Sequence, residues 1–209
     1  MNKKEIYVSF NMIVQNEELR IRKTLENIKD VADEIIIVDG GSYDDTVKIC
    51  QEYTDKIFFK HFDGNFSEQK NFANSKCRGR WIFNIDADEI LNDNLKKDLI
   101  TILQANEGID ILYLARRNII KDLDLSLATK WRWTIDKDGD INYPDFQGRI
   151  FKNSGIVRWV GNVHERIGGY QHFGKLPVEK DTGYFLIHDK VMSRQIKQNE
   201  YYETLINNG

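Results

Sequence analysis

The sequence is poor in the residues that cross-link or interrupt a chain, with two cysteines and two prolines among 209 residues. Cys50 and Cys77 have neither the Cys-x-x-Cys nor the Cys/His spacing of a zinc site, and so few thiols are typical of a reducing compartment. Pro144 and Pro177 form no proline-rich linker. The sequence therefore argues against a disulfide scaffold and predicts a single domain over residues 1–209.

The sequence also lacks long apolar runs and an excess of charge of one sign. No stretch is apolar for long enough to form a signal peptide or to span a membrane. Lys and Arg number 30 against 33 Asp and Glu, a formal net charge of −3, and no basic block would attract a phosphodiester backbone. We therefore expect a cytoplasmic protein that does not bind nucleic acid, and peripheral association with the inner face of the membrane stays open.

What is present is a regular alternation of strand and helix patterns in residues 1–115. Continuous apolar or β-branched runs, typical of buried strands, alternate with segments whose apolar residues recur at helical spacing. Strands are expected at 6–14, 34–39, 56–60, 81–85 and 109–115, and helices after Asn16, after Gly41, at 68–77 and at 92–104. This alternation predicts an α/β fold with a mainly parallel sheet flanked by helices.

Local signals predict how these helices begin. Asn16 is expected to cap the first helix, with Leu19 on its inner face. Ser42 and Asp45 have capping-box spacing before the second helix, and Ser67 precedes the third.

The pattern changes after residue 116 to short aromatic strands and turns. Residues 131–143 and 148–161 each predict a β-hairpin, and this half is expected to extend the sheet. A strand at 183–188 leads into a last helix. Residues 191–209 stop inside a helix-like stretch, which leaves open a longer parent chain.

The segment "WIFNIDADEIL" at 81–91 places three carboxylates directly after a buried strand. In an extended chain Asp86 and Asp88 point the same way, so both can face one divalent cation, and oxygen ligands suit Mg(II) or Mn(II). The alternative is that the acids cap the following helix. Without a ligand we expect the cluster to be under electrostatic strain, with Glu89 holding the loop through local hydrogen bonds. Ligands of such sheets collect at the carboxyl ends of the strands, where Asp39 also lies.

Five segments together resemble the family 2 glycosyltransferases of the GT-A fold, and within them a subgroup acting on cell-surface glycans. They are "MIVQNEE" (12–18), "DEIIIVDGGSYDDT" (33–46), "FSEQKNFANSKCRGRWIFNIDADEIL" (66–91), "GRIFKN" (148–153) and "VGNVHERI" (160–167). The resemblance covers most of the chain in family order. It implies a GT-A, Rossmann-like mixed sheet that binds a nucleotide-diphospho-sugar.

The resemblance also implies where the donor binds. A UDP-sugar is expected across a nucleotide-binding half, 1–115, with the acceptor against 116–190. Asp39 corresponds to the carboxylate that contacts the base in this family, and Asn16 and Glu17 correspond to residues beside the nucleoside.

The same resemblance implies which four residues contact the diphosphate and the metal. Asp86 and Asp88 match the Asp-x-Asp motif, in which the first usually faces ribose and metal and the second ligates the metal. Lys70 stands where the family usually has arginine, which keeps the charge but loses the bidentate fork. His188 corresponds to the late histidine that completes metal coordination in many GT-A enzymes, and a neutral imidazole suits Mn(II).

The general base is expected in "GNVHER". Glu165 matches the acidic position of the family best, while His164 could orient it, touch the acceptor or be the base itself. The alternative for Glu165 is an ion pair with Arg166 on a solvated loop. The aromatic residues that could stack on an acceptor sugar, or pack in the core, are Trp131, Trp133 and Trp159.

We therefore predict a glycosyltransferase that moves a hexose from a UDP-sugar to a saccharide, lipid-linked glycan or peptide acceptor. The resemblance favours an inverting, metal-dependent reaction with Mn or Mg as cofactor. A nucleotidyltransferase is an alternative, although it needs a glycine-rich loop where this chain has "VQNEE". A nucleotide-sugar binding module without turnover is another.

Overall fold

The protein is described by a computed structural model that covers residues 5–162 and 165–207. Its first half has the predicted alternation. The elements are β1 (Val8–Val14), α1 (Ile21–Ile28), β2 (Glu34–Asp39), α2 (Thr46–Gln51), β3 (Ile57–Phe59), α3 (Phe66–Lys76), β4 (Trp81–Asn84), β5 (Glu89–Leu91) and α4 (Asp93–Ala105). The short strand β5 was not predicted.

The second half is built from longer and shorter strands. It comprises β6 (Ile111–Lys121), α5 (Leu125–Lys130), β7 (Ile141–Lys152), β8 (Arg158–Val160), β9 (Arg166–Gly168), β10 (Phe173–Lys175), β11 (Phe185–Val191) and α6 (Met192–Asn207). The predicted terminal strand and last helix are present as β11 and α6. The strand expected at 109–115 extends further, to Lys121.

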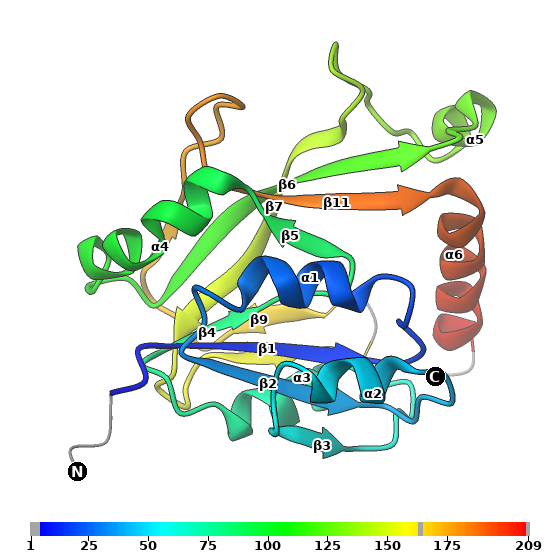
Figure 1. The fold of residues 1–209 in the computed structure, drawn as a ribbon. Coiled ribbons are helices and arrows are strands. Elements are labelled where there is room, and N and C mark those ends of the chain that lie inside the picture. The colour runs from blue at the N-terminus through cyan, green and yellow to red at the C-terminus, as the bar shows by residue number, and fades with distance from the viewer. Residues whose placement is uncertain (1–4, 163–164, 208–209) are drawn as a thin grey trace.

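One twisted sheet joins the two halves (Figure 1). Its order is β3-β2-β1-β4-β7-β6-β11-β5, with β10 paired to β6. β1 pairs in parallel with β2 and β4, and β2 pairs in parallel with β3, whereas β7 is antiparallel to both β4 and β6. The carboxyl ends of β1, β2 and β4 therefore meet at one edge of the sheet, and α6 runs along that edge in Figure 1.

Apolar side chains cover both faces of the sheet. Ile35 and Ile37 of β2 belong to one buried cluster, while Ile36 belongs to another. The continuous apolar run of β2 thus reflects burial on both sides. At the centre, Phe10 of β1 stacks on Phe83 of β4 with ring centroids 4.6 Å apart.

Several predicted helix starts are wrong because the side chains bond elsewhere. α1 begins at Ile21 and Leu19 is 83% exposed, so Asn16 does not cap it. Asn16 instead has a positive φ of 57°. Ser42 accepts a hydrogen bond from the Asn16 N–H, and α2 has no side-chain cap at Asp45.

The third and fourth helices are capped by asparagines. Asn65 caps α3 by accepting from the Glu68 N–H, while the Ser67 hydroxyl donates to the Gly161 carbonyl. The predicted cap at Ser67 is therefore wrong, and Ser67 ties α3 to a loop of the second half. Asn92 caps α4, within one residue of the expected start.

The expected hairpin at 148–161 is also wrong. β8 pairs with β9 in a separate two-stranded sheet rather than folding back on β7. At 131–143 the chain makes a tight turn closed by a single antiparallel bridge between Ile135 and Ile141.

The carboxylate segment is not extended. After β4 ends at Asn84, Ala87 and Asp88 lie in a turn that leads into β5. The expectation that an extended backbone orients Asp86 and Asp88 is therefore wrong, and their placement depends on side-chain contacts. In the described part of the chain, no helix has the length and apolar character needed to cross a membrane.

Candidate active site

A cavity of about 640 Å³ opens at the carboxyl ends of the parallel strands β1 and β4. The second half supplies part of its wall through β6, β7 and β11, and α6 closes one side. The predicted site residues that line it are Glu17, Lys70, Asp86, Asp88, Glu165 and His188. Residues far apart in the sequence thus line one cavity, and their roles stay predictions.

A second cavity of about 370 Å³ adjoins the first and shares Ile13, Glu17 and Phe66 with it. Its walls come from the end of β1, the turn after β2 and one side of α6. Aromatic and aliphatic side chains make up much of its lining, including Val14, Phe62 and Tyr201. The first cavity is polar and highly charged by comparison.

Asp39 and Asn16 lie beside the cavities rather than in their lining. The Asp39 carboxylate accepts hydrogen bonds of 3.1 Å from the N–H groups of Gly41 and Ser42. Asn16 accepts from the Tyr43 N–H at 3.0 Å. Both residues therefore hold the turn after β2, and their contact with a nucleotide stays a prediction. His164 lies outside the described residues.

The carboxylates after β4 are balanced by a buried arginine. Arg149 of β7 is 3% exposed, and its Nη2 lies 2.6 Å from both Asp86 Oδ2 and Glu89 Oε1. Glu89 in turn accepts from the Asp86 N–H at 3.1 Å, as the local role predicted for it requires. Arg116 of β6 adds a second cation 3.3 Å from Glu89.

This pairing contradicts the expectation of electrostatic strain in the ligand-free cluster. Burial alone would raise the pKa of Asp86, but the charges of Arg149 and Lys70 outweigh burial and hold that pKa far below its usual range. The expected strain is wrong because the compensating cations come from strands and helices outside the segment. Asp86 therefore stays ionised without any ligand.

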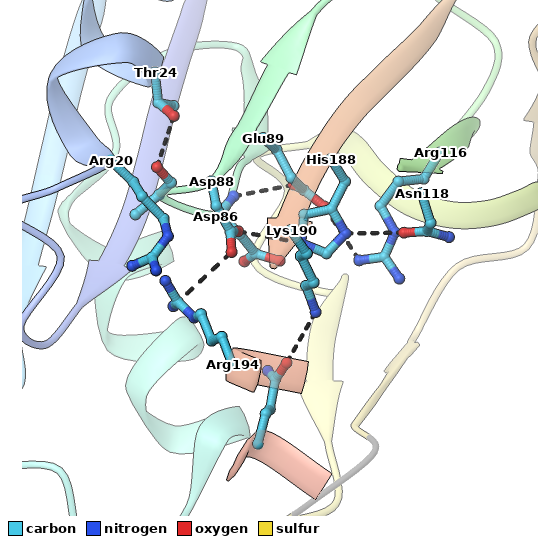
Figure 2. Close-up of polar contacts among 12 residues, drawn as sticks. Arg20, Thr24, Asp86, Asp88, Glu89, Arg116, Asn118, His188, Lys190 and Arg194 are labelled. Carbon is cyan, nitrogen blue, oxygen red and sulfur yellow. Dashed lines mark hydrogen bonds and ion pairs between the residues drawn. The ribbon is translucent and has the colours of Figure 1, made fainter. Parts of the chain in front are cut away.

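Asp88 faces a different partner, His188 of β11. Its Oδ1 lies 3.4 Å from His188 Nε2, and Figure 2 shows the two side chains next to each other. Burial would raise the pKa of Asp88, but the hydrogen bond and charge of His188 lower it to about 2. Arg194 of α6 pairs with Glu17 and lies 3.9 Å from the other Asp88 oxygen.

The tautomer of His188 follows from Asn118 of β6. The Asn118 amide nitrogen donates to Asp145 at 3.0 Å and to the Ile141 carbonyl at 3.3 Å, so its oxygen faces His188 Nδ1 at 2.8 Å. Nδ1 therefore carries a proton and donates it to Asn118. Nε2 then carries either a second proton that pairs with Asp88 or a lone pair that a metal ion can accept.

The donor set around Asp88 suits a divalent ion that is only partly held by protein. A carboxylate oxygen and an imidazole nitrogen whose other ring nitrogen is anchored are ligands typical of Mn(II). Among the described residues, no group of three or more His, Cys, Asp or Glu side chains has metal-binding geometry.

The predicted base and the predicted diphosphate cation are paired with each other. Lys70 Nζ of α3 lies 2.5 Å from Glu165 Oε1, and both side chains are largely buried. The ammonium also lies 4.2 Å from the centre of the Trp159 ring. The alternative pairing of Glu165 with Arg166 is not found among the ion pairs of the described residues. The contacts of α3 with Gly161 and Asn162 bring this loop to Lys70.

Two of the three tryptophans line the larger cavity, Trp133 and Trp159. Trp159 is 7% exposed and donates its indole N–H to Asn84 at 2.7 Å, so it packs in the core as well as bordering the cavity. Trp133 is more exposed and packs on Trp131 with ring centroids 4.9 Å apart.

Sequence reasoning predicted Lys70 but missed the other cations of this site. Arg149 lies in "GRIFKN", a segment used only for the resemblance, and its pairing with Asp86 depends on β7 lying antiparallel beside β4. Arg116, Lys190 and Arg194 also line the cavity. A basic residue on the inward face of a strand next to an acidic turn is the signal that could have found Arg149.

Comparisons with known proteins agree with this geometry. The model of the family described as "Glycosyl transferase family 2" matches residues 9–173. A lipopolysaccharide core biosynthesis glycosyltransferase of Rhizobium meliloti, LpsC, is 38% identical over 93% of this chain and 68% of its own length. An uncharacterised glycosyltransferase of Rickettsia typhi is 40% identical over 92 residues, which are 44% of this chain and 31% of that protein. The chain thus spans about a third of the Rickettsia relative.

Solved structures share the fold. TarS 1-349 of S. aureus in complex with UDP has a TM-score of 0.59 at 14% identity, over 87% of this chain and 60% of that one. The same fragment in complex with UDP-GlcNAc has a TM-score of 0.57 at 14% identity, over 87% and 58%. The predicted GT-A fold is confirmed.

The buried charge cluster makes a stability prediction. Replacing Arg149 with Met leaves Asp86 and Glu89 without their shared cation and should lower the free energy of unfolding by about 3–5 kcal/mol, measured by urea denaturation. The matched control is Arg80→Met, which removes an exposed pair with Glu107 and should change stability by less than about 1 kcal/mol. Equal effects of the two substitutions would show that Arg149 does not balance the cluster.

Proposed function

Because the chain belongs to glycosyl transferase family 2, we propose that it transfers a hexose from a UDP-sugar to a hydroxyl-bearing acceptor, with inversion and with a divalent metal. The observation that carries the proposal is the grouping of Asp88, His188, Lys70 and Glu165 in one cavity. These residues offer metal ligands, a cation for phosphate oxygens and a carboxylate base within one space. TarS, which shares the fold, was crystallised with UDP and with UDP-GlcNAc.

The two cavities suit the two ends of such a donor. The smaller cavity, with Phe62 and Val14 in its wall and the Asp39 turn beside it, would take the uracil and ribose. The larger one would take the diphosphate and the sugar next to Asp88 and Lys70. Asp86 would face the ribose, with its carboxylate held in place by Arg149.

Asp88 and His188 would hold the metal, Mn or Mg, through one carboxylate and one imidazole. When bound there, the ion supplies Lewis acidity to the phosphate that leaves with the nucleotide. Lys70 would place a positive charge on the same phosphates. His188 keeps its orientation through Asn118, which fixes the nitrogen that faces the ion.

Glu165 would act as the base in a single displacement. The acceptor oxygen forms a bond to the anomeric carbon while the bond from that carbon to the phosphate oxygen breaks, and the electron pair leaves with UDP. Glu165 takes the proton of the acceptor hydroxyl. Lys70 would then be shared between Glu165 and the phosphates. The part of His164 in this step stays a prediction.

The acceptor would be a saccharide, a lipid-linked glycan or a peptide. The printed role of the Rhizobium relative in lipopolysaccharide core biosynthesis supports a cell-surface glycan. Trp133 in the cavity wall offers a flat apolar face for a pyranose ring. We also propose that the reaction takes place in the cytoplasm or at the inner face of the membrane.

Donor binding can be tested by thermal unfolding with UDP, ADP, TDP and GDP, each with and without Mn(II). UDP with metal at about 100 times its Kd should stabilise the protein by about 2.7 kcal/mol. Asp88→Asn should abolish most of that gain because it removes the charged metal ligand. Asp45→Asn, an exposed carboxylate outside both cavities, is the matched control and should behave like wild type. A full UDP response in Asp88→Asn would contradict the assigned metal site.

The base can be tested separately from donor binding. Glu165→Gln should lower the transfer rate, or the slow hydrolysis of a UDP-sugar, by about 10²–10⁴-fold. UDP affinity should change little, because the substitution leaves Asp88, His188 and Lys70 in place. Glu107→Gln serves as the control, because Glu107 pairs with Arg80 just before β4 and lines neither cavity. UDP binding without any turnover in wild type would favour the inert binding module instead.

A further inference from the structure

Lys190 is a cation of the larger cavity that the proposed reaction has not used. It follows His188 by two residues on β11, so both side chains lie on the same face of that strand. Both line the cavity, and Figure 2 shows the Lys190 side chain between His188 and the first turns of α6. Its ammonium therefore lies on the side of the cavity that holds the proposed metal ligands.

The partners of Lys190 differ from those of the other cavity cations. Lys70 pairs with Glu165, and Arg194 pairs with Glu17. Lys190 Nζ instead contacts two neutral amide oxygens, Gln195 Oε1 at 3.0 Å and Gln198 Oε1 at 2.8 Å. Within the described part of the chain it forms no ion pair with a carboxylate.

This environment favours an anion beside Lys190. Lys190 is half-buried in the cavity wall, and the hydrogen bonds that its ammonium forms there go to neutral amide oxygens. A negatively charged ligand would supply what the surrounding side chains do not.

We infer that Lys190 binds a phosphate oxygen of the nucleoside diphosphate and neutralises charge on that group as the sugar departs. The inference rests on the proposed function, because it places the diphosphate beside Asp88 and His188. Gln195 and Gln198 position the ammonium from α6, so this helix contributes to the donor site through Lys190. The flexible lysine stem lets the ammonium follow the phosphate during the reaction.

The competing explanation is that Lys190 only braces β11 against α6. The two explanations differ in which ligands lose affinity when Lys190 is replaced. If Lys190 binds the diphosphate, its replacement weakens the binding of UDP but not of uridine, which lacks phosphate. If Lys190 is only a brace, its replacement disturbs the whole wall of the cavity and weakens the binding of both.

The test is calorimetric titration of UDP with Mn(II), and of uridine, into wild type and variants of the whole chain. Lys190→Met should weaken UDP binding by about tenfold or more and leave uridine affinity within about twofold. Lys190→Gln, which keeps a hydrogen-bonding side chain without the charge, should give the same result. It replaces Lys190→Met in the titration if that variant does not fold. Lys190→Arg should recover most of the UDP affinity. Lys121→Met is the matched control, because Lys121 pairs with Asp189 outside the cavity.

Unchanged UDP affinity in Lys190→Met and Lys190→Gln, with normal UDP binding in wild type, would overturn the inference and leave the proposed function intact. Parallel losses for UDP and uridine would also overturn it, in favour of the brace. Failure of wild type to bind UDP with metal would instead remove the proposed function, and the inference with it.

Discussion

The site depends on one buried guanidinium. Arg149 reaches from β7 to the turn after β4 and holds Asp86 and Glu89 with a single nitrogen, 2.6 Å from each carboxylate. The Glu89 side chain is fully buried and that of Asp86 is 36% exposed. Without such a cation, repulsion and desolvation would oppose placing two carboxylates so close together at the end of a core strand. Glu89 then fixes the backbone of Asp86, and the turn presents Asp88 to the cavity. The antiparallel pairing of β4 and β7 is therefore part of the site.

The three acids after β4 therefore have two different roles. Asp86 and Glu89 are neutralised by the protein itself, whereas Asp88 faces His188, whose tautomer Asn118 sets. A metal ion held by Asp88 and His188 would meet few protein ligands. In the proposed function, the diphosphate of the nucleotide would supply the oxygens that the protein does not.

Much of the fold could be predicted because each buried strand reads as an apolar run between helices with helical spacing. The meeting of Lys70, Asp88, Glu165 and His188 followed from the family resemblance, since no local pattern links residues as distant in the sequence as Lys70 and Glu165, which are 95 positions apart. The cations could not be predicted in the same way. Arg149 acts across a strand pair whose register is a tertiary property, and Ser67 bonds a distant carbonyl instead of capping its helix. The expected strain was wrong for this reason: the sequence near Asp86 contains the acids but not their partners.

The most direct test of this division is the affinity of Mn(II) for the protein with and without UDP. Manganese should be titrated into the ligand-free protein and into protein carrying one bound UDP per chain, with free manganese followed by electron paramagnetic resonance. If the protein alone offers only Asp88 and His188, UDP should tighten manganese binding by about tenfold or more, within the usual range of coupling between two sites. Equal manganese affinity in the two states would contradict this, because it would mean that the acids already form a complete metal site.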